Sequence, residues 1–378
     1  MRRKSVTGML ITMLALMFSI SSQAQSSSED SKINKLLTAN AKRFLKNKNV
    51  NSVSIGVYKD GQTYTAHLGE LEKGKGNTPN DETLYEIGSV SKTVTGYLTA
   101  KVVKEGKISL EDDIRLYLPG EYPNLEYQGS PIRIKHLLTH TGNVPMFLPL
   151  AMNGLYETLA KDVPEKYRSL EESYSKEQFF EDLSKIEVLK EPGTSYSYSN
   201  AGSEIVGHIL EKVYEKSIDE LLTENFSQAL NIKSLAIHLD AAEEDKLIQG
   251  YWLDNDTPAP NQANVLWATG SGMKMTMHDM MQYAKLQLDE DNPIVKESQR
   301  GLFDRRPGSK VAYFWNMRQD KHGSSYEHHG GTSGMQNWLF IFPKYDLALS
   351  IMSNHSSAKM PAQLGKTAKK ILAELIKG

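Results

Sequence analysis

Ser89 and Lys92 are the pair of residues whose types and spacing point most directly to chemistry. They lie in the run EIGSVSKTV, residues 86–94. Residues three apart share one face of a helix, so the lysine amine can lie beside the serine hydroxyl and take its proton. Ser89 is therefore a candidate nucleophile and Lys92 a candidate general base. A lysine acts as a base only when uncharged, so burial or cationic neighbours would have to lower its pKa.

The Ser-x-x-Lys pattern occurs four times, and its surroundings separate the copies. The copy at 173–176 lies in a polar run, that at 271–274 begins between two glycines, and that at 356–359 follows an apparent strand end. Ser89 instead opens a predicted helix that stops at Gly106, and the positive end of a helix dipole favours an oxyanion. The helix has one predicted buried stripe, formed by Val90, Val94, Tyr97, Leu98 and Val102. The alternative for Ser89 is a plain helix N-cap.

Tyr198 and Asn200 form a second candidate pair. They lie between the chain break at Pro192-Gly193 and a helix predicted from Gly202. A tyrosine beside the Ser/Lys pair can carry a proton to and from a leaving group if a nearby cation lowers its pKa. The Asn200 amide can hold both a lysine and a substrate carbonyl. The alternative is that Asn200 caps its helix and Tyr198 only packs.

A glycine-rich run at the end of a predicted strand, HGGTSG at 329–334, is the third candidate piece. Gly330 and Gly331 would let a substrate lie against the strand edge beside His329. The backbone N–H of Thr332 is predicted to join that of Ser89 in an oxyanion hole. The alternative is a simple turn between two strands.

The predicted elements place these pieces in an α+β architecture. Strands are predicted near both ends of the chain and helices in the middle. We therefore expect one antiparallel sheet flanked by helices, built from residues 25–106 and 246–378, with an inserted all-helical domain at 107–245. The cleft between them is the expected site. The predicted strands are 53–58, 64–68, 311–317, 326–329, 337–342 and 347–352.

The N-terminus is predicted to be an export signal. Three basic residues at 2–4 precede an apolar stretch at 9–20, which is too short to span a bilayer comfortably. Small residues at 22–24 suggest cleavage there, so residues 1–24 are the predicted signal peptide. We expect a bacterial periplasmic or secreted protein without a stable membrane anchor after cleavage. The alternative is a retained anchor.

Composition excludes several functions. The 378 residues carry a formal net charge of -2, which argues against a binder of nucleic acid. The absence of cysteine excludes a cysteine nucleophile and thiolate metal sites. His328 and His329 are adjacent, and neighbouring strand residues face opposite ways, so they would not easily share an ion. We predict no metal and no cofactor, and a small-molecule ester, amide or peptide as substrate.

The three pieces together resemble the penicillin-recognising serine hydrolases, and most closely their class C β-lactamase-like branch. Ser-x-x-Lys at 89–92, Tyr-x-Asn at 198–200 and the His-Gly-Gly strand at 329–331 come in that family's order and rough spacing. The resemblance runs from about residue 32 to 377 and implies a β-lactamase/transpeptidase-like fold. The flanking runs that agree are IGSVSK, GKISLED, HLLTHT and YSNAG, at 87–92, 106–112, 136–141 and 198–202.

The resemblance also implies a mechanism. Ser89 would form an acyl-enzyme, with the proton traffic shared by Lys92 and Tyr198, and water would then release the acid. Asn200 and the strand at His329 would hold the substrate. Which of Lys92 and Tyr198 is the base stays open at this point.

Two departures from the family bear on the substrate. Many β-lactamases of this branch carry Lys-Thr-Gly on the third motif strand, and this chain has none; His329 is predicted to replace that lysine. A histidine is largely neutral at pH 7, so it would attract a substrate carboxylate less firmly than lysine. A His-x-Gly strand resembles esterases and D-aminopeptidases of the family. The run HTGN at 140–143 replaces His-Thr-Ser-Gly and is expected to shape the cleft mouth.

Three functions are therefore weighed. The first is an exported serine hydrolase acting on esters or on small D-amino-acid peptides and amides. The second is a β-lactamase or D-alanyl-D-alanine carboxypeptidase, against which the missing lysine counts. The third is a catalytically inactive binding protein of the same fold, against which the presence of all three motif groups counts.

Overall fold

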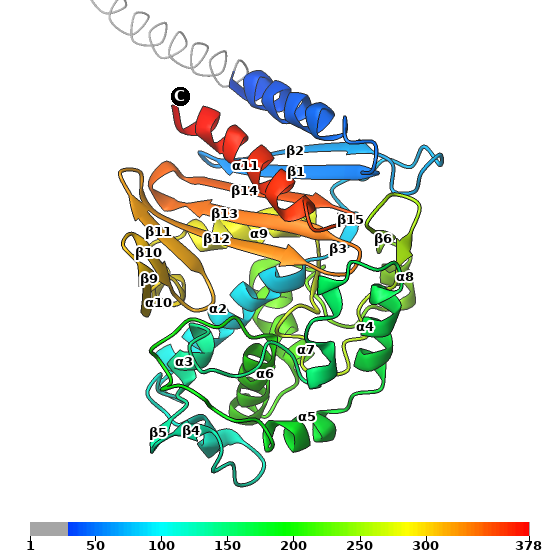
Figure 1. The fold of residues 1–378 in the computed structure, drawn as a ribbon. Helices are drawn as coiled ribbons and strands as arrows, with labels where there is room; N and C mark the ends of the chain where they lie inside the picture. The colour runs from blue at the N-terminus through cyan, green and yellow to red at the C-terminus, as the bar shows by residue number, and fades with distance from the viewer. Residues whose placement is uncertain (1–28, 378) are drawn as a thin grey trace, which may run out of the picture.

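A single antiparallel sheet forms the centre of the molecule. The structure is a computed structural model and describes residues 29–377, so the predicted signal peptide lies outside the described residues (Figure 1). Both ends of the chain contribute strands, which confirms the predicted sheet. In spatial order the strands are β2 (Gln62–Gly69), β1 (Ser52–Lys59), β14 (Leu347–Ser353), β13 (Gln336–Phe342), β12 (Gly323–Gly331), β11 (Asn316–Asp320), β10 (Ser309–Val311) and β9 (Phe303–Arg306).

The β1–β2 hairpin joins the N-terminal part of the chain to the C-terminal strands. Asp60 and Gly61 both have positive φ, 49° and 84°, and two-residue turns of this kind match the twist of paired strands. β1 then pairs with β14 from Ser54 to Lys59. Residues almost three hundred positions apart thus share one sheet, which fixes the first candidate motif close to the last.

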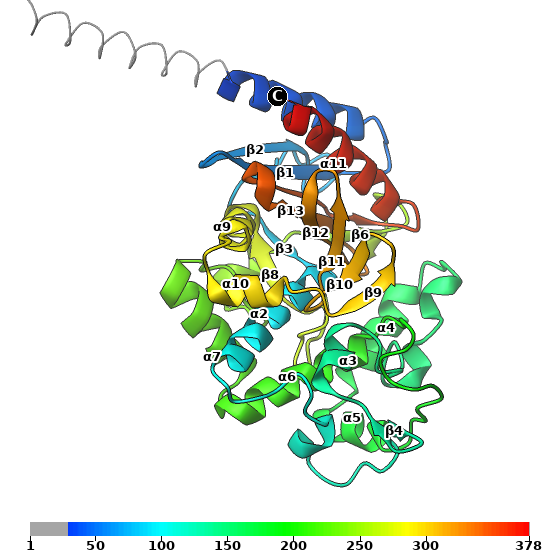
Figure 2. The same ribbon diagram turned by 90° about the vertical axis from the view of Figure 1, so that its left-hand side faces the viewer.

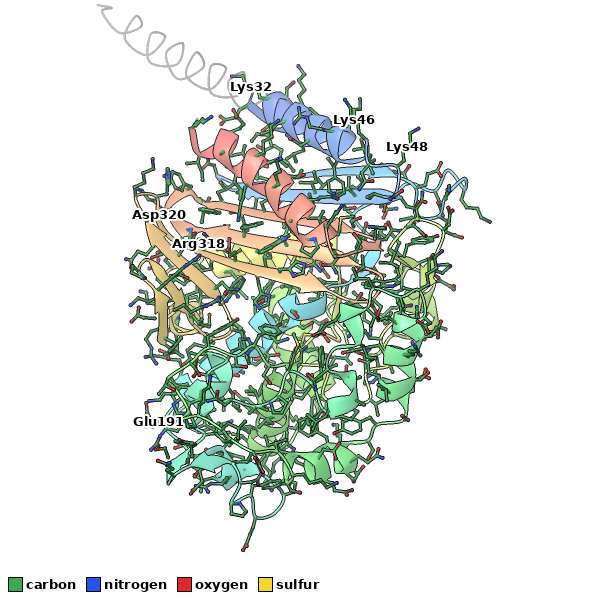
Figure 3. All side chains as sticks on the ribbon, viewed as in Figure 1. Lys32, Lys46, Lys48, Glu191, Arg318 and Asp320 are labelled. Atoms are coloured by element: carbon green, nitrogen blue, oxygen red, sulfur yellow. The ribbon has the colours of Figure 1, made fainter. Side chains whose placement is uncertain are left out.

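Helices cover both faces of the sheet. The N-terminal helix, residues 29–44, and α11 (Met360–Lys377) lie on one face, where their apolar residues share a core with Val57 and Leu349. Lys32 and Lys46 are exposed along this N-terminal segment (Figure 3). On the opposite face lie α9 (Met277–Leu288) and α2 (Ser91–Lys104), as Figure 2 shows.

A largely helical region lies below the sheet in Figure 1 and packs on α2. Its helices are α3 (Ile134–Leu138), α4 (Val163–Glu172), α5 (Lys176–Leu183), α6 (Asn200–Tyr214), α7 (Ile218–Leu222) and α8 (Ala241–Glu244). A small hairpin of β4 (Glu126–Tyr127) and β5 (Ser130–Pro131) also lies there, so the prediction of an all-helical region is wrong in this detail. The domain boundaries themselves stay a prediction.

Short elements complete the structure and connect the sheet to the helical region. The helix α10 (Pro293–Ser298) packs on α2. None of the helices described within residues 29–377 is long and apolar enough to cross a membrane. The short strands are β3 (Leu84–Glu86), β6 (Gly250–Trp252), β7 (Pro258–Ala259), β8 (Lys274–Thr276) and β15 (His355–Ser356).

The predicted strand 311–317 is wrong. The structure interrupts it at residues 312–315, between β10 and β11, where Phe314 has a φ of 66°. Residues 312–315 are buried in a loop against α2, and Phe314 N–H donates to Leu138 O at 2.9 Å. A buried loop and a buried strand give the same apolar signal in sequence, which explains the error.

The face of the sheet under α11 should carry much of the stability. Leu364 in α11 is fully buried, so Leu364→Ala should lower the free energy of unfolding by about 2–5 kcal/mol. Urea unfolding measures this loss. Lys369→Ala, at an exposed position of the same helix, is the control and should change it by less than about 0.5 kcal/mol. Equal effects of the two variants would show that α11 does not pack as described.

Candidate active site

A short 3-10 turn, η1 (Gly88–Val90), carries Ser89 to the edge of β12. Gly88 has a φ of 51°, and a Cβ at this position would lie 2.5 Å from Gly331 N. Only glycine allows this approach of turn and strand. The chain continues directly into α2, so Lys92 lies one turn after Ser89, as predicted.

Lys92 is completely buried, with 0% of its surface exposed. Its amine lies 3.4 Å from Ser89 Oγ and donates to Asn200 Oδ1 and to Gly270 O, both at 2.5 Å. Burial disfavours the charged amine and lowers the pKa of Lys92 to about 7, although the nearby charge of Glu204 opposes this shift. A substantial share of Lys92 is therefore uncharged at neutral pH, as a base requires.

Tyr198 completes the surroundings of the nucleophile. Its hydroxyl donates to Ser89 Oγ at 2.8 Å, and the Lys92 amine lies 4.8 Å from the centre of its ring. Burial raises the pKa of Tyr198 well above its usual range, so the phenol is neutral. The geometry favours Lys92 as the group that accepts the Ser89 proton, with Tyr198 as a hydrogen-bond donor and proton carrier.

Asn200 is free to hold Lys92 because another residue caps α6. Ser199 is the N-cap, and its hydroxyl accepts a hydrogen bond from Gly202 N–H at 2.8 Å. The alternative that Asn200 merely caps its helix is therefore wrong. The first residue of α6 instead brings its amide to the buried amine.

Glu204, which sequence reasoning missed, lies one turn after Asn200 on the same face of α6. Its two oxygens accept hydrogen bonds from Trp267 N–H at 3.0 Å and Gly270 N–H at 2.9 Å. These bonds hold the loop whose Gly270 O receives the Lys92 amine. The spacing of four residues from Asn200 was the available signal, but nothing in the sequence shows what the carboxylate contacts.

On the strand of the third motif, the histidine nearest Lys92 is His328, one residue before the predicted His329. In β12, His329 lies opposite Trp338, and the centres of the two tilted rings are 5.0 Å apart. Its Nε2 lies 2.6 Å from Gln336 Oε1. His328 faces the other side of the strand and is close enough to Lys92 for that positive charge to help lower its pKa, which burial mainly brings to about 3. Both histidines line the cavity, so substrate contact by His329 stays a prediction, and the structure adds His328 as the neutral side chain on the Lys92 side of the strand.

The strand also presents a different N–H group from the one predicted. Thr332 N–H donates to Met335 O at 2.9 Å across the β12–β13 turn, so it is not free. Successive N–H groups along a strand point in opposite directions, so Gly331 N–H points away from β13 and toward η1. β11 does not reach this point, because its pairing with β12 ends at Glu327. Gly331 therefore replaces Thr332 as the candidate oxyanion donor beside Ser89 N–H.

Gly330 allows the strand to approach the nucleophile turn. A Cβ at Gly330 would lie 2.0 Å from Ile87 O, so no larger residue fits there without movement. The amide of Asn337, opposite Gly330 in the register, donates to Ile87 O at 2.9 Å. The strand edge and η1 are thus locked together.

His140 from the run HTGN supports Tyr198 from behind. It has a φ of 56°, its ring lies 4.4 Å from that of Tyr198, and its Nδ1 accepts from Ser199 N–H at 3.2 Å. Burial, with the charge of Lys92 added, keeps the pKa of His140 well below its ordinary value. His140 therefore positions the Tyr198 loop and contributes no charge.

One open cavity of about 470 Å³ lies in front of the nucleophile. It is lined by, among others, Ser89, Tyr198, Asn200 and Thr332. Its mouth is partly apolar, since Met146 and Leu159 line it and are 46% and 40% exposed. Within residues 29–377 no group of three or more metal-ligating side chains occurs.

This arrangement is that of a serine hydrolase that works by acyl transfer. The β-lactamase family model matches residues 37–374, and the chain belongs to the β-lactamase family. Among solved structures, a class C β-lactamase superposes with a TM-score of 0.77 at 18% identity, covering 92% of this chain and 99% of that one. A β-lactamase/D-alanine carboxypeptidase from Yersinia pestis gives 0.75 at 19%, covering 91% and 98%. Both confirm the fold.

Two curated relatives are similar over much of the chain. The protein flp of Staphylococcus aureus strain MRSA252 is 25% identical over 323 residues, which cover 82% of this chain and 60% of flp. A β-lactamase of Providencia stuartii is 25% identical over 253 residues, covering 65% and 58%. The chain thus spans about 60% of the length of the curated relatives it matches.

The contact between Glu204 and the Lys92 loop predicts a change in pH dependence. Glu204→Gln removes a negative charge that raises the pKa of Lys92, so that pKa should fall. The acidic limb of kcat/KM against pH, where Lys92 loses its proton, should therefore move to lower pH.

The control is Glu211→Gln, on the same helix. Glu211 also contacts this loop, accepting from Trp267 Nε1 at 2.7 Å, whereas the charge that raises the pKa of Lys92 is that of Glu204. Its acidic limb should stay in place. A limb that moves equally in both variants, or in neither, would rule out the assigned link between Glu204 and Lys92.

Proposed function

We propose that the chain is an exported serine hydrolase that forms an acyl-enzyme at Ser89 on esters or small D-amino-acid peptides and amides. The observation that carries the proposal is the position of Ser89 Oγ, 2.8 Å from a neutral tyrosine hydroxyl and 3.4 Å from a buried amine. Burial lowers the pKa of that amine to about 7. The basic and apolar N-terminal segment supports export to the periplasm or the medium.

The proposed reaction follows from these contacts. Ser89 Oγ attacks the substrate carbonyl while its proton passes to the neutral amine of Lys92. The oxyanion forms between the N–H groups of Ser89 and Gly331, which are the candidate donors at this edge. Tyr198 and Lys92 return the proton to the leaving group, and a water molecule activated by the same pair releases the acid.

The substrate class follows from the uncharged strand. Burial holds the pKa values of His328 and His329 below the ordinary histidine value, so neither is a cation at neutral pH. A substrate carboxylate would find no partner on β12 like the lysine of many β-lactamases. Together with the apolar mouth of the cavity, this favours esters and amides that present no carboxylate to β12.

A second candidate is a β-lactamase or D-alanyl-D-alanine carboxypeptidase. It is favoured by the similar solved structures, which are a β-lactamase/D-alanine carboxypeptidase and a class C β-lactamase. An inactive binding protein of the same fold is the third candidate, and the hydrogen-bonded Ser89, Lys92 and Tyr198 count against it.

The nucleophile and the base are tested with p-nitrophenyl butyrate. Wild-type protein should release p-nitrophenol and show a butyryl adduct by intact mass, whereas Ser89→Ala should show neither. Lys92→Met should lower kcat/KM by roughly 10²- to 10⁴-fold, because proton transfer to a positioned base contributes about that much. A thermal melt separates this loss from unfolding, since Met leaves the Asn200 and Gly270 acceptors unpaired. Undiminished turnover in either variant would contradict the proposal.

The neutral strand is tested by adding a charge. His328→Lys should raise the ratio of kcat/KM for an anionic over a neutral substrate by roughly ten- to a hundredfold, the worth of one charged hydrogen bond. A suitable pair is a penicillin and p-nitrophenyl butyrate. His329→Lys is the comparison variant, because that side chain lines the same cavity but lies on the Trp338 face of the strand, away from Lys92. A gain only in His329→Lys would support the original assignment of His329.

A further inference from the structure

A second, smaller cavity opens behind Asn200, and the proposed reaction makes no use of it. It has a volume of about 60 Å³. This is enough space for roughly four water molecules. Phe147, Tyr167, Asn200 and Ser271 line both this cavity and the larger one, so the two adjoin at Asn200. The smaller cavity is therefore the adjoining space for a group attached to the acyl side of a substrate whose carbonyl meets Ser89.

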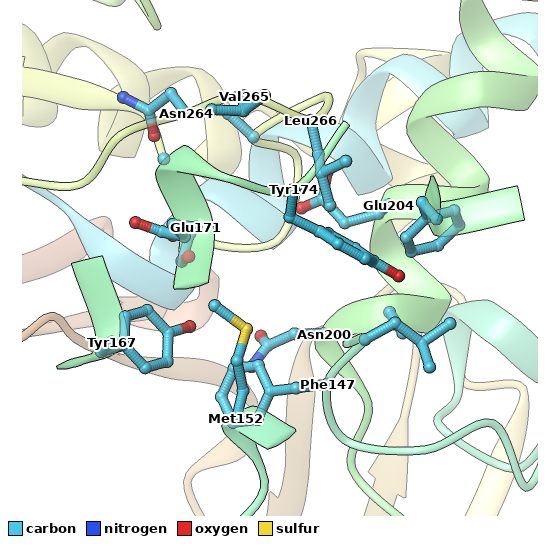
Figure 4. A pocket seen from close by; sticks show the side chains of 16 residues that line it. Phe147, Met152, Tyr167, Glu171, Tyr174, Asn200, Glu204, Asn264, Val265 and Leu266 are labelled. Atoms are coloured by element: carbon cyan, nitrogen blue, oxygen red, sulfur yellow. The ribbon is translucent and has the colours of Figure 1, made fainter. Parts of the chain in front are cut away.

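The walls of this smaller cavity, which we call the rear pocket, are mainly apolar, and their only charged groups are two carboxyls. The uncharged polar side chains among the lining residues are those of Tyr167, Tyr174, Asn200, Asn264 and Ser271. Figure 4 shows the labelled apolar side chains surrounding the space, with Glu171 on one side and Glu204 on the other. No lysine, arginine or histidine is among the described residues that line it. The charged residues of the rear pocket are thus of one sign.

The two carboxyl groups differ in how many of their oxygens accept hydrogen bonds from the protein. Both oxygens of Glu204 are engaged by backbone N–H groups of the 267–270 loop. Glu171 Oε2 accepts from Ala263 N–H at 3.0 Å, and no bond to its Oε1 is found within the described part of the chain. Arg168, whose charge reaches Glu171, donates instead to Asn261 O and to Glu172. Glu171 therefore offers one carboxylate oxygen without a cationic partner.

The surroundings of Glu171 make a cation the matching ligand. Burial, reinforced by the charges of Glu86 and Glu204, raises the pKa of Glu171 to about 7, so the lone carboxylate is disfavoured there. A positive charge in the rear pocket would stabilise the buried carboxylate of Glu171 and offset the repulsion from Glu86 and Glu204. Tyr167 lies one turn before Glu171 on the same face of α4 and lines the same space, which leaves room only for a short side chain.

We propose that the rear pocket binds a small aliphatic group carrying a primary ammonium on the acyl side of the substrate, with Glu171 as its partner. The substrate is then an amino-acyl ester or amide with a free amine. This inference rests on the proposed function and narrows it, since an acyl group without an amine would leave Glu171 unpaired.

The test compares substrates that differ only in an ammonium and a methyl group of similar size. The pairs are D-alanine p-nitroanilide with 2-methylpropanoyl p-nitroanilide, and β-alanine p-nitrophenyl ester with p-nitrophenyl butyrate. In at least one pair, kcat/KM of the wild type should be tenfold or more higher for the amine. Glu171→Gln should reduce that ratio by tenfold or more. The ratio is used because a folding defect lowers both rates together.

Glu165→Gln, at an exposed position of the same helix, is the control and should leave the ratio unchanged. A wild type that hydrolyses p-nitrophenyl butyrate without preferring either amine would overturn the amine site and leave the proposed hydrolase standing. An unchanged preference in Glu171→Gln would overturn the role of Glu171. Absence of both turnover and a Ser89-dependent adduct with every substrate would overturn the proposed function, and the amine site with it.

Discussion

The burial of one amine is the constraint on which the rest of the site depends. Lys92 gives up its hydration, and a buried ammonium is tolerated only where acceptors replace water. Asn200 from α6 and Gly270 from the following loop supply them, so α2, α6 and the 267–270 loop must meet at this point. The same burial that disfavours the charge makes the neutral amine available beside Ser89. The packing that buries Lys92 is therefore also what makes its amine reactive.

The acceptors themselves need support, and this extends the site into the helical region. Glu204 fixes the loop that carries Gly270, while Ser199 takes the capping role that Asn200 would otherwise fill. His140 packs against Tyr198 in a backbone conformation that non-glycine residues rarely adopt. Each group belongs to an element that carries no reacting atom. The helical region thus positions the chemistry that begins at the sheet edge.

What the sequence could predict follows from how local each signal is. Ser89, Lys92, Tyr198 and Asn200 lie in short patterns whose spacing predicts their roles. The structure places Lys92 beside the cavity that the other three line. The hairpin of β1 and β2 was equally local, through its turn residues. On β12, by contrast, His-His-Gly-Gly permits two frames that differ by one residue, and only the pairing with β13 decides which side chain and which N–H face Ser89. Glu204 and the loop at 312–315 depend on distant contacts that no local pattern encodes.

The distribution of charge across the cleft gives its two ends different characters. At the sheet edge, His328 and His329 are kept neutral by burial, so β12 offers hydrogen bonds and close backbone approach without a cation. Behind Asn200, two carboxyl groups face a mainly apolar space. Lys92 lies near both ends, and its own charge is marginal near pH 7. A substrate whose positive end lies at the rear and whose uncharged end leaves at the strand would meet no like charge, whereas the reversed orientation would leave Glu171 unpaired. The orientation of a substrate in this cleft therefore depends on two features: β12 carries no cation because burial keeps its histidines neutral, and the rear pocket carries carboxyl groups.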